Sequence, residues 1–188
     1  MGRWQPDPGG RLQQAALELY AERGYEQTTV AEIADRAGLT ERTFFRHFAD
    51  KREALFRGSG ELEQLIVDAV DAAPPSATPI KAIAAGLAAA GAIFDADRRP
   101  HSSKRQSVID ANPELQEREL VKLASLAAAL ADALRRRDVQ DPIARLTAEA
   151  GVAVFRVAFE RWIQDDSDRD FARFVHEGID ELRTVAAS

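Results

Sequence analysis

Basic, hydroxyl and aromatic side chains gather in one short stretch, ERTFFRHFADK, at residues 41–51. An arginine guanidinium can pair with guanine through two parallel hydrogen bonds, and basic or hydroxyl groups can bind phosphate oxygens. At helical spacing, Phe44 and Phe48 turn inward. The outer face then carries Arg42, Thr43, Phe45, Arg46 and His47. The chemistry that this face offers is recognition of nucleic acid.

Catalytic chemistry finds little support elsewhere in the chain. Its three histidines, His47, His101 and His176, lie far apart in the sequence, and cysteine is absent. No G-x-S-x-G, H-E-x-x-H or glycine-rich phosphate loop occurs. We therefore predict no catalytic residue, no metal site and no cofactor, and a protein that is not an enzyme.

Two short helices joined by a glycine turn are predicted to position this outer face. Thr29 and Glu32 have the spacing of a capping box, which starts a helix that runs to about Ala37. Gly38 permits a sharp turn, and Thr40 can cap the next helix, over about 41–48. This arrangement is a helix-turn-helix, whose second helix enters the major groove of DNA.

Residues 10–57 resemble the N-terminal domain of the TetR family of bacterial one-component repressors. The residues that carry the resemblance are Thr29, Ile33-Ala34, Ala37-Gly38-Leu39-Thr40, Thr43, Phe45, His47-Phe48, Lys51 and Leu55. The resemblance implies that Thr29, Thr43, His47 and Lys51 contact phosphates. Where the family often has Tyr, this chain has Phe45, which can stack on sugars or join the core but cannot donate a hydrogen bond.

The remaining roles follow from side-chain chemistry. Arg42 is the candidate for base reading, and Arg46 is a candidate phosphate contact. Arg3, on an N-terminal arm, is either a further DNA contact or uninvolved. The complete predicted DNA-binding set is Thr29, Thr40, Arg42, Thr43, Phe45, Arg46, His47 and Lys51.

The net charge of −6 is distributed unevenly along the chain. Residues 1–57 contain nine Lys/Arg and nine Asp/Glu, whereas residues 58–188 contain the remaining 16 and 22. Any affinity for DNA must therefore come from a local basic face instead of a basic domain.

The fold class expected from these patterns is all-α, with about nine helices. We expect a helix-turn-helix domain of three helices over 1–56 and a larger helical domain for ligand binding and dimerisation over 57–188. A capping box at Asp50 is predicted to open one long helix to about Ala72. Proline after a capping residue marks later starts at Thr78-Pro79, Asn112-Pro113 and Asp141-Pro142. The predicted later helices span about 79–97, 101–110, 113–137, 142–165 and from Asp165 to about 185.

The larger domain offers a candidate effector pocket. Its small side chains over 82–92 can either line a cavity or let helices pack closely, and the basic cluster over 98–105 can either bind an acidic ligand or remain solvated. The predicted pocket residues are Leu87, Gly91, Phe94, Arg105, Leu123, Leu126, Leu130 and Phe155.

The last two helices are predicted to form a homodimer interface. Residues 152–159 are apolar on almost every side, so an apolar helix there must be covered on every side, partly by a second subunit. The predicted interface residues are Val154, Ala158, Trp162, Phe171, Phe174, Gly178 and Leu182. A purely intramolecular core is the alternative.

The leading functional prediction is a dimeric repressor that a small-molecule effector, either apolar or similar to an acyl-CoA, releases from its operator. The expected partners are a palindromic or pseudo-palindromic double-stranded DNA operator, the effector and a second copy of the chain. We expect no membrane partner and a cytoplasmic location. The alternative is a helical adaptor or scaffold that binds proteins and not DNA, and binding to random DNA would distinguish the two.

Overall fold

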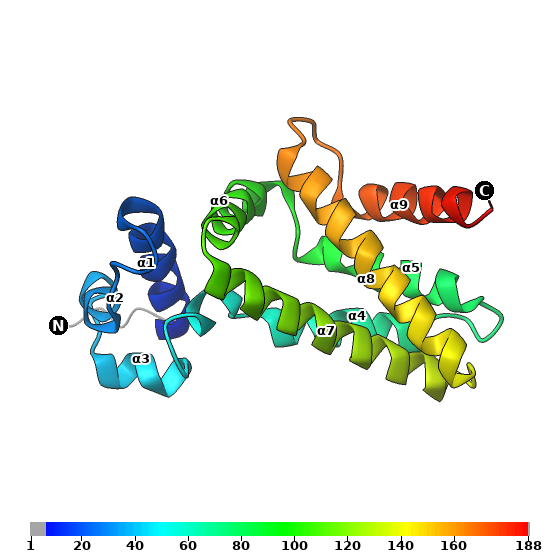
Figure 1. Ribbon diagram of the computed structural model, residues 1–188, viewed down its shortest axis with the longest axis horizontal. Helices are drawn as coiled ribbons and strands as arrows, with labels where there is room; N and C mark the ends of the chain where they lie inside the picture. The colour runs from blue at the N-terminus through cyan, green and yellow to red at the C-terminus, as the bar shows by residue number, and fades with distance from the viewer. Residues whose placement is uncertain (1–6, 188) are drawn as a thin grey trace. The chain divides into compact units, whose positions relative to one another are not determined.

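The computed structural model describes residues 7–187, and the predicted Arg3 contact lies outside this range. Over the described residues the chain forms nine α-helices and three short 3-10 helices, without a β-strand (Figure 1). The all-α fold predicted from the sequence is therefore confirmed. The chain divides into two compact units, which are described separately below.

The first unit contains the residues up to Gly58 together with Lys104–Glu119. Its elements are α1 (Pro8–Arg23), α2 (Val30–Arg36), α3 (Glu41–His47) and the 3-10 helix η1 (Glu53–Phe56). One core joins them, and Val108, Ile109 and Leu115 belong to it. This unit is therefore assembled from two separate stretches of sequence, which differs from the single stretch 1–56 that we predicted.

The second unit contains Ser59–Ser103 and Leu120–Ser188. Its helices are α4 (Ser59–Asp71), α5 (Pro79–Ala89), α8 (Asp141–Gln164) and α9 (Phe171–Ala186), with the 3-10 helices η2 (Ala90–Ala92) and η3 (Ala96–Arg98). The helices α6 (Arg99–Asp110) and α7 (Pro113–Arg136) contribute residues to both units. A single apolar core, distinct from that of the first unit, fills the second.

The predicted long helix from Asp50 to Ala72 is two elements. The Asp50 carboxylate does accept hydrogen bonds from the backbone N–H groups of Arg52 and Glu53, but the helix that follows is only η1. Gly58 then adopts φ 87°, a left-handed conformation that favours glycine and interrupts the helix before α4.

Two further predicted boundaries are also wrong. The helix expected over 79–97 ends as an α-helix at Ala89 and continues through η2 and η3. The last helix begins at Phe171 instead of Asp165, because Asp170 supplies the cap, accepting from the Arg173 amide at 2.9 Å.

Small residues in the second unit allow helices to cross closely. A Cβ atom on Gly86 of α5 would lie 2.5 Å from Val70 Cγ2 and 2.8 Å from the Ile66 carbonyl oxygen of α4. One on Gly151 of α8 would lie 2.6 Å from Ile83 Cγ2 of α5. At these positions the small side chains serve close packing.

No single described helix combines the length and apolar character needed to cross a bilayer, although the bent pair Pro79–Ala92 and Ala96–Asp110 passes the same test of length and composition.

Candidate nucleic-acid interface

The two helices of the helix-turn-helix begin at threonine caps, as predicted. The Thr29 hydroxyl accepts from the Glu32 amide at 3.3 Å, while the Glu32 carboxylate accepts from the Thr29 amide at 2.9 Å. This bond from the Thr29 backbone lowers the pKa of Glu32. Thr40 accepts from the Thr43 amide at 3.2 Å and so fixes the start of α3. Both hydroxyls are therefore already engaged in capping.

The turn between α2 and α3 is held by backbone bonds and by a side chain from α1. Gly38 has φ 64°, and the Leu39 amide donates to the Ala34 carbonyl at 2.8 Å. Arg11 donates from Nη2 to the carbonyls of Ala37 at 2.8 Å and Gly38 at 3.4 Å. Free carbonyls at a helix C-terminus need such donors. The sequence analysis missed Arg11, because a contact 26 residues away leaves no local pattern.

Ion pairs brace α2 against α1. The Arg36 guanidinium binds both carboxylate oxygens of Glu22, at 3.1 and 2.9 Å, and reaches Glu18 at 3.4 Å. The bond from Arg36 lowers the pKa of Glu22. Arg23 of α1 pairs with Glu32 at 2.8 Å. Arg23 of α1 and Arg36 of α2 are thus paired with acidic neighbours.

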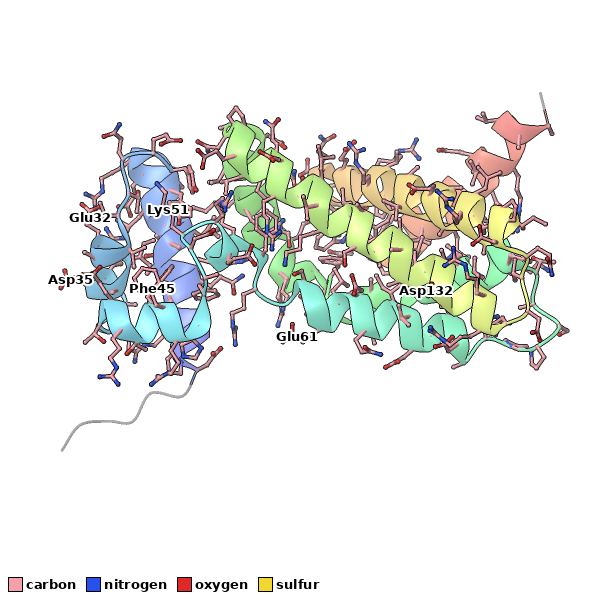
Figure 2. The ribbon with its side chains drawn as sticks, turned by 60° about the horizontal axis from the view of Figure 1, so that its bottom comes forward. Glu32, Asp35, Phe45, Lys51, Glu61 and Asp132 are labelled. Carbon is pink, nitrogen blue, oxygen red and sulfur yellow. The ribbon has the colours of Figure 1, made fainter. Side chains whose placement is uncertain are left out.

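The outer face of α3 remains open. Phe44 and Phe48 are buried in the core, whereas Phe45 is 56% exposed (Figure 2). Arg42 and Arg46 are exposed and form no ion pair with the described residues. His47 is also exposed, and Thr43 is half-buried. Four side chains on this face, Arg42, Phe45, Arg46 and His47, are therefore free to meet a partner.

Lys51 does not lie as the resemblance implies. Its Nζ donates to the carbonyls of Tyr25 at 2.9 Å and Thr28 at 3.3 Å, and lies 4.1 Å from the centre of the Tyr25 ring. Tyr25 is buried, and this burial raises the pKa of its phenol. The ammonium group holds the connection between α1 and α2 and is not directed at a free surface in this structure (Figure 2).

A cleft of about 430 Å³ lies beside the C-terminus of α3 within the first unit. The pair Glu53–Arg118 bridges part of its wall, and Arg52 is paired with Asp50 at 2.7 Å. The sequence did not predict this cleft. The residues that line it are His47, Phe48, Ala49, Asp50, Arg52, Glu53, Phe56, Arg57 and Arg118.

The predicted effector-pocket residues do not all belong to one unit. Arg105 belongs to the first unit, where its Nε donates to the Leu55 carbonyl at 2.7 Å and its guanidinium lies 4.9 Å from the Phe56 ring centre. Burial there lowers the pKa of Arg105. These contacts of Arg105 lie within the first unit, and its place in an effector pocket stays a prediction. In the second unit Gly91, Phe94 and Leu123 are half-buried. The predicted pocket residues that are buried in its core are Leu87, Leu126, Leu130 and Phe155.

The residues predicted for the dimer interface are mostly internal. Ala158, Trp162 and Phe171 have no exposed surface, and Leu182 is half-buried. Val154, Phe174 and Gly178 are also buried. Neighbours within the same chain cover these six residues, as expected for the alternative of a purely intramolecular core.

Among the residues from 7 to 187, no three His, Cys, Asp or Glu side chains are placed to hold a metal ion.

Comparison with known proteins covers both units. The family model "Bacterial regulatory proteins, tetR family" matches residues 12–57, and the model "MftR C-terminal domain" matches residues 77–187. The chain belongs to the TetR family of regulators. A helix-turn-helix at its N-terminus and a helical domain after it are the TetR-family arrangement that we expected.

Two curated TetR-family relatives extend over most of the chain. It is 27% identical to the HTH-type transcriptional regulator TcmR of Streptomyces glaucescens, covering 92% of this chain and 81% of TcmR. It is 29% identical to the putative mycofactocin biosynthesis transcriptional regulator MftR of Mycobacterium tuberculosis, covering 89% and 85%.

The same fold occurs in the transcriptional regulator FadR of Bacillus subtilis, solved in complex with stearoyl-CoA. That structure has a TM-score of 0.59 and 20% identity, and the match covers 92% of this chain and 96% of FadR. The relatives are transcriptional regulators, which favours a regulator over the adaptor considered above.

Proposed function

We propose that this chain is a homodimeric transcriptional repressor that binds a two-half-site operator and is released by a small-molecule effector. The observation that carries the proposal is the outer face of α3, on which Arg42 and Arg46 are exposed without an ion pair among the described residues. A helix-turn-helix places such side chains against base edges and phosphates. A cytoplasmic location is part of the proposal, because the operator is there.

A dimer accounts for how a unit without a basic surplus would bind DNA tightly. Two copies of α3, spaced by one turn of DNA at about 34–36 Å, would double the contacts. We propose that the copies meet on an exposed stripe of α8 whose apolar members recur at intervals of three and four residues, the spacing of a helix–helix seam. The stripe consists of the exposed residues Ile143, Leu146, Ala153 and Val157 and the half-buried Ala150.

The core of the second unit is the proposed place of the effector. Its buried surface is almost entirely apolar, which suits an apolar ligand or the acyl part of a ligand. FadR, a structural neighbour, was solved with stearoyl-CoA, which supports this ligand class. Release requires that the effector bind the DNA-free state more tightly than the DNA-bound state.

The direct test selects bound sequences from a pool of random duplexes and then measures affinity for the selected duplex over a range of salt concentrations. We expect a selected sequence with two related halves, and an affinity that falls as salt rises. A chain that enriches no sequence and shows no salt-dependent binding to random DNA would instead be an adaptor.

A further inference from the structure

Five aromatic rings form one cluster in the second unit. Phe94 is its centre, since its ring centre lies 4.9 Å from that of Phe171, 5.2 Å from Phe159, 5.5 Å from Trp162 and 6.1 Å from Phe155. The other four rings come from α8 and from the first residue of α9. Trp162 and Phe171 have no exposed surface.

Phe94 differs from the other four in the backbone that carries it. It lies between η2 and η3, outside any regular α-helix, and is half-buried. Its own amide donates to the Ala90 carbonyl at 3.0 Å, while the residues on either side form short 3-10 turns. The ring that contacts all the others is therefore carried by the least regular backbone around the cluster.

Two buried N–H groups at this cluster have no acceptor. Neither Trp162 Nε1 nor Arg99 Nε has a hydrogen-bond partner among residues 7–187, and both atoms are buried. The Arg99 guanidinium lies 5.3 Å from the centre of the Trp162 ring. Buried donors are normally satisfied, and an unsatisfied one costs about 1–3 kcal/mol. Two such donors together indicate a place for a hydrogen-bond acceptor.

Arg99 is held firmly at this position. Its Nη1 donates to the carbonyls of Asp165 at 2.6 Å and Ser167 at 2.5 Å, and its Nη2 donates to the Arg169 carbonyl at 2.8 Å. These bonds tie the start of α6 to the loop between α8 and α9. They engage the terminal nitrogens and leave Nε directed elsewhere.

The charge of Arg99 is already opposed within the same loop. The Asp165 carboxylate lies 3.8 Å from Arg99 Nη1, and hydrogen bonds from Arg169 and Ser167 lower the pKa of Asp165 to about 2. Arg169 lies in turn 3.7 Å from the Glu177 carboxylate. Because Asp165 already opposes the charge of Arg99, the place beside Arg99 Nε favours a neutral acceptor over a further negative charge.

We propose that the effector takes the place of the Phe94 ring, packs between the remaining rings and accepts hydrogen bonds from Trp162 Nε1 and Arg99 Nε through a neutral carbonyl oxygen. The ligand class is an apolar, ring-bearing molecule with a carbonyl group. This inference rests on the proposed function, because it names the chemistry of the effector. It also assigns the site to Trp162 and Phe171, which the sequence had assigned to the dimer.

The first experiment observes the indole N–H directly. The chain has two tryptophans, so Trp4→Phe leaves Trp162 as the only source of an indole signal in a ¹H–¹⁵N correlation spectrum. We expect 4-phenylbutan-2-one to move this signal downfield and saturably, because the N–H gains an acceptor. Butylbenzene, which has a similar shape and no acceptor, should not produce the downfield shift.

Variants then test separately the N–H donor of Trp162 and the Phe94 ring that the ligand is proposed to displace. Trp162→Phe keeps a ring and removes the N–H, so the affinity for the ketone, followed on the ligand's own resonances, should fall about tenfold. Phe94→Ala and the milder Phe94→Leu should raise it, since the ligand no longer displaces a ring. The ketone is added to three proteins: Trp4→Phe alone, Trp4→Phe with Phe94→Ala, and Trp4→Phe with Phe94→Leu. If the indole signal of Trp162 moves in none of them, the proposal is overturned.

Two further measurements complete the test: the affinity for a charged probe and the effect of the ketone on operator affinity. If 4-phenylbutyrate binds more tightly than the ketone, the assignment of a neutral acceptor is wrong. If the ketone binds at Trp162 but leaves operator affinity unchanged, this site stands and effector-controlled release fails. If another compound releases the operator without moving the indole signal, the proposed function stands and this site is wrong.

Discussion

Arg42 and Lys51 carry the same charge but have opposite surroundings. Arg42 is exposed on α3 without an ion pair among the described residues, whereas the Lys51 ammonium binds two carbonyls and faces the Tyr25 ring. A free guanidinium can exchange water for a base edge at little cost. A bound ammonium must first leave its partners. The two residues should therefore respond differently to substitution.

Arg42→Ala is expected to relax base preference. Losing a bidentate contact with guanine should reduce discrimination at one position of each half-site by about 1–3 kcal/mol. Competition titrations with single-base operator variants measure this loss. Unchanged affinity and unchanged base preference would remove Arg42 from the interface.

Lys51→Met is expected to lower stability before it affects DNA. Removal of the ammonium leaves the Thr28 carbonyl without this donor and the Tyr25 carbonyl with only the Thr28 amide at 3.2 Å, at a cost of about 1–3 kcal/mol in the free energy of unfolding. Denaturant titration measures it. Arg46→Met is the matched control, for which we expect unchanged stability and weaker DNA binding. If Lys51→Met kept full stability and instead flattened the salt dependence of DNA binding, Lys51 would be a phosphate contact.

At the scale of the helix, local patterns predicted several starts correctly but did not show where a predicted helix is interrupted. The threonine caps of α2 and α3 were confirmed, as were starts near Pro79, Pro113 and Pro142. The Thr78 hydroxyl, however, makes no capping bond, so proline at the first turn is the effective signal there.

The missed interruption at Gly58 has a physical cause that no local pattern shows. Ala54, Leu55 and Phe56 are buried in the core of the first unit, while Ile66 and Val70 are buried in that of the second. Which core a side chain enters depends on distant partners. The same reason explains why burial of Trp162 and Phe171 was attributed to a second subunit.

Gly86→Ala tests whether the small residues of α5 serve packing. The added Cβ would lie 2.8 Å from the Ile66 carbonyl oxygen, and backbone gives way poorly, so we expect a loss of about 1–3 kcal/mol in the free energy of unfolding. Gly60→Ala in α4 is the control, because a Cβ there meets nothing within 4 Å. It should be neutral or stabilising by up to about 1 kcal/mol. Equal effects of the two substitutions would contradict close packing at Gly86.

For the whole molecule, the proposed dimer places a specific demand on the surface of α8. Leu146 is 73% exposed, and Ile143 and Val157 of the same stripe are 54% and 40% exposed, so three large apolar side chains of the stripe meet solvent. Leu146→Glu would put a charge into the proposed stripe and raise the dimer dissociation constant at least about tenfold. Sedimentation equilibrium measures that constant, and operator affinity should fall with it.

Leu120→Glu provides the matched control, since Leu120 is 57% exposed on α7 and lies outside the stripe. We expect it to leave the dimer intact. If Leu120→Glu separated the subunits and Leu146→Glu did not, the interface would lie on α7 and the proposed stripe would be wrong.

The discontinuous first unit has a consequence during synthesis of the chain. Its core includes Val108, Ile109 and Leu115, so the helices up to Gly58 have an incomplete core until the segment ending at Glu119 has left the ribosome. The delay is 61 residues, the difference between positions 119 and 58, or about 3–12 s at typical rates of translation. During that interval the nascent helix-turn-helix exposes apolar surface to the cell, and a fragment that stops at Gly58 would expose it permanently.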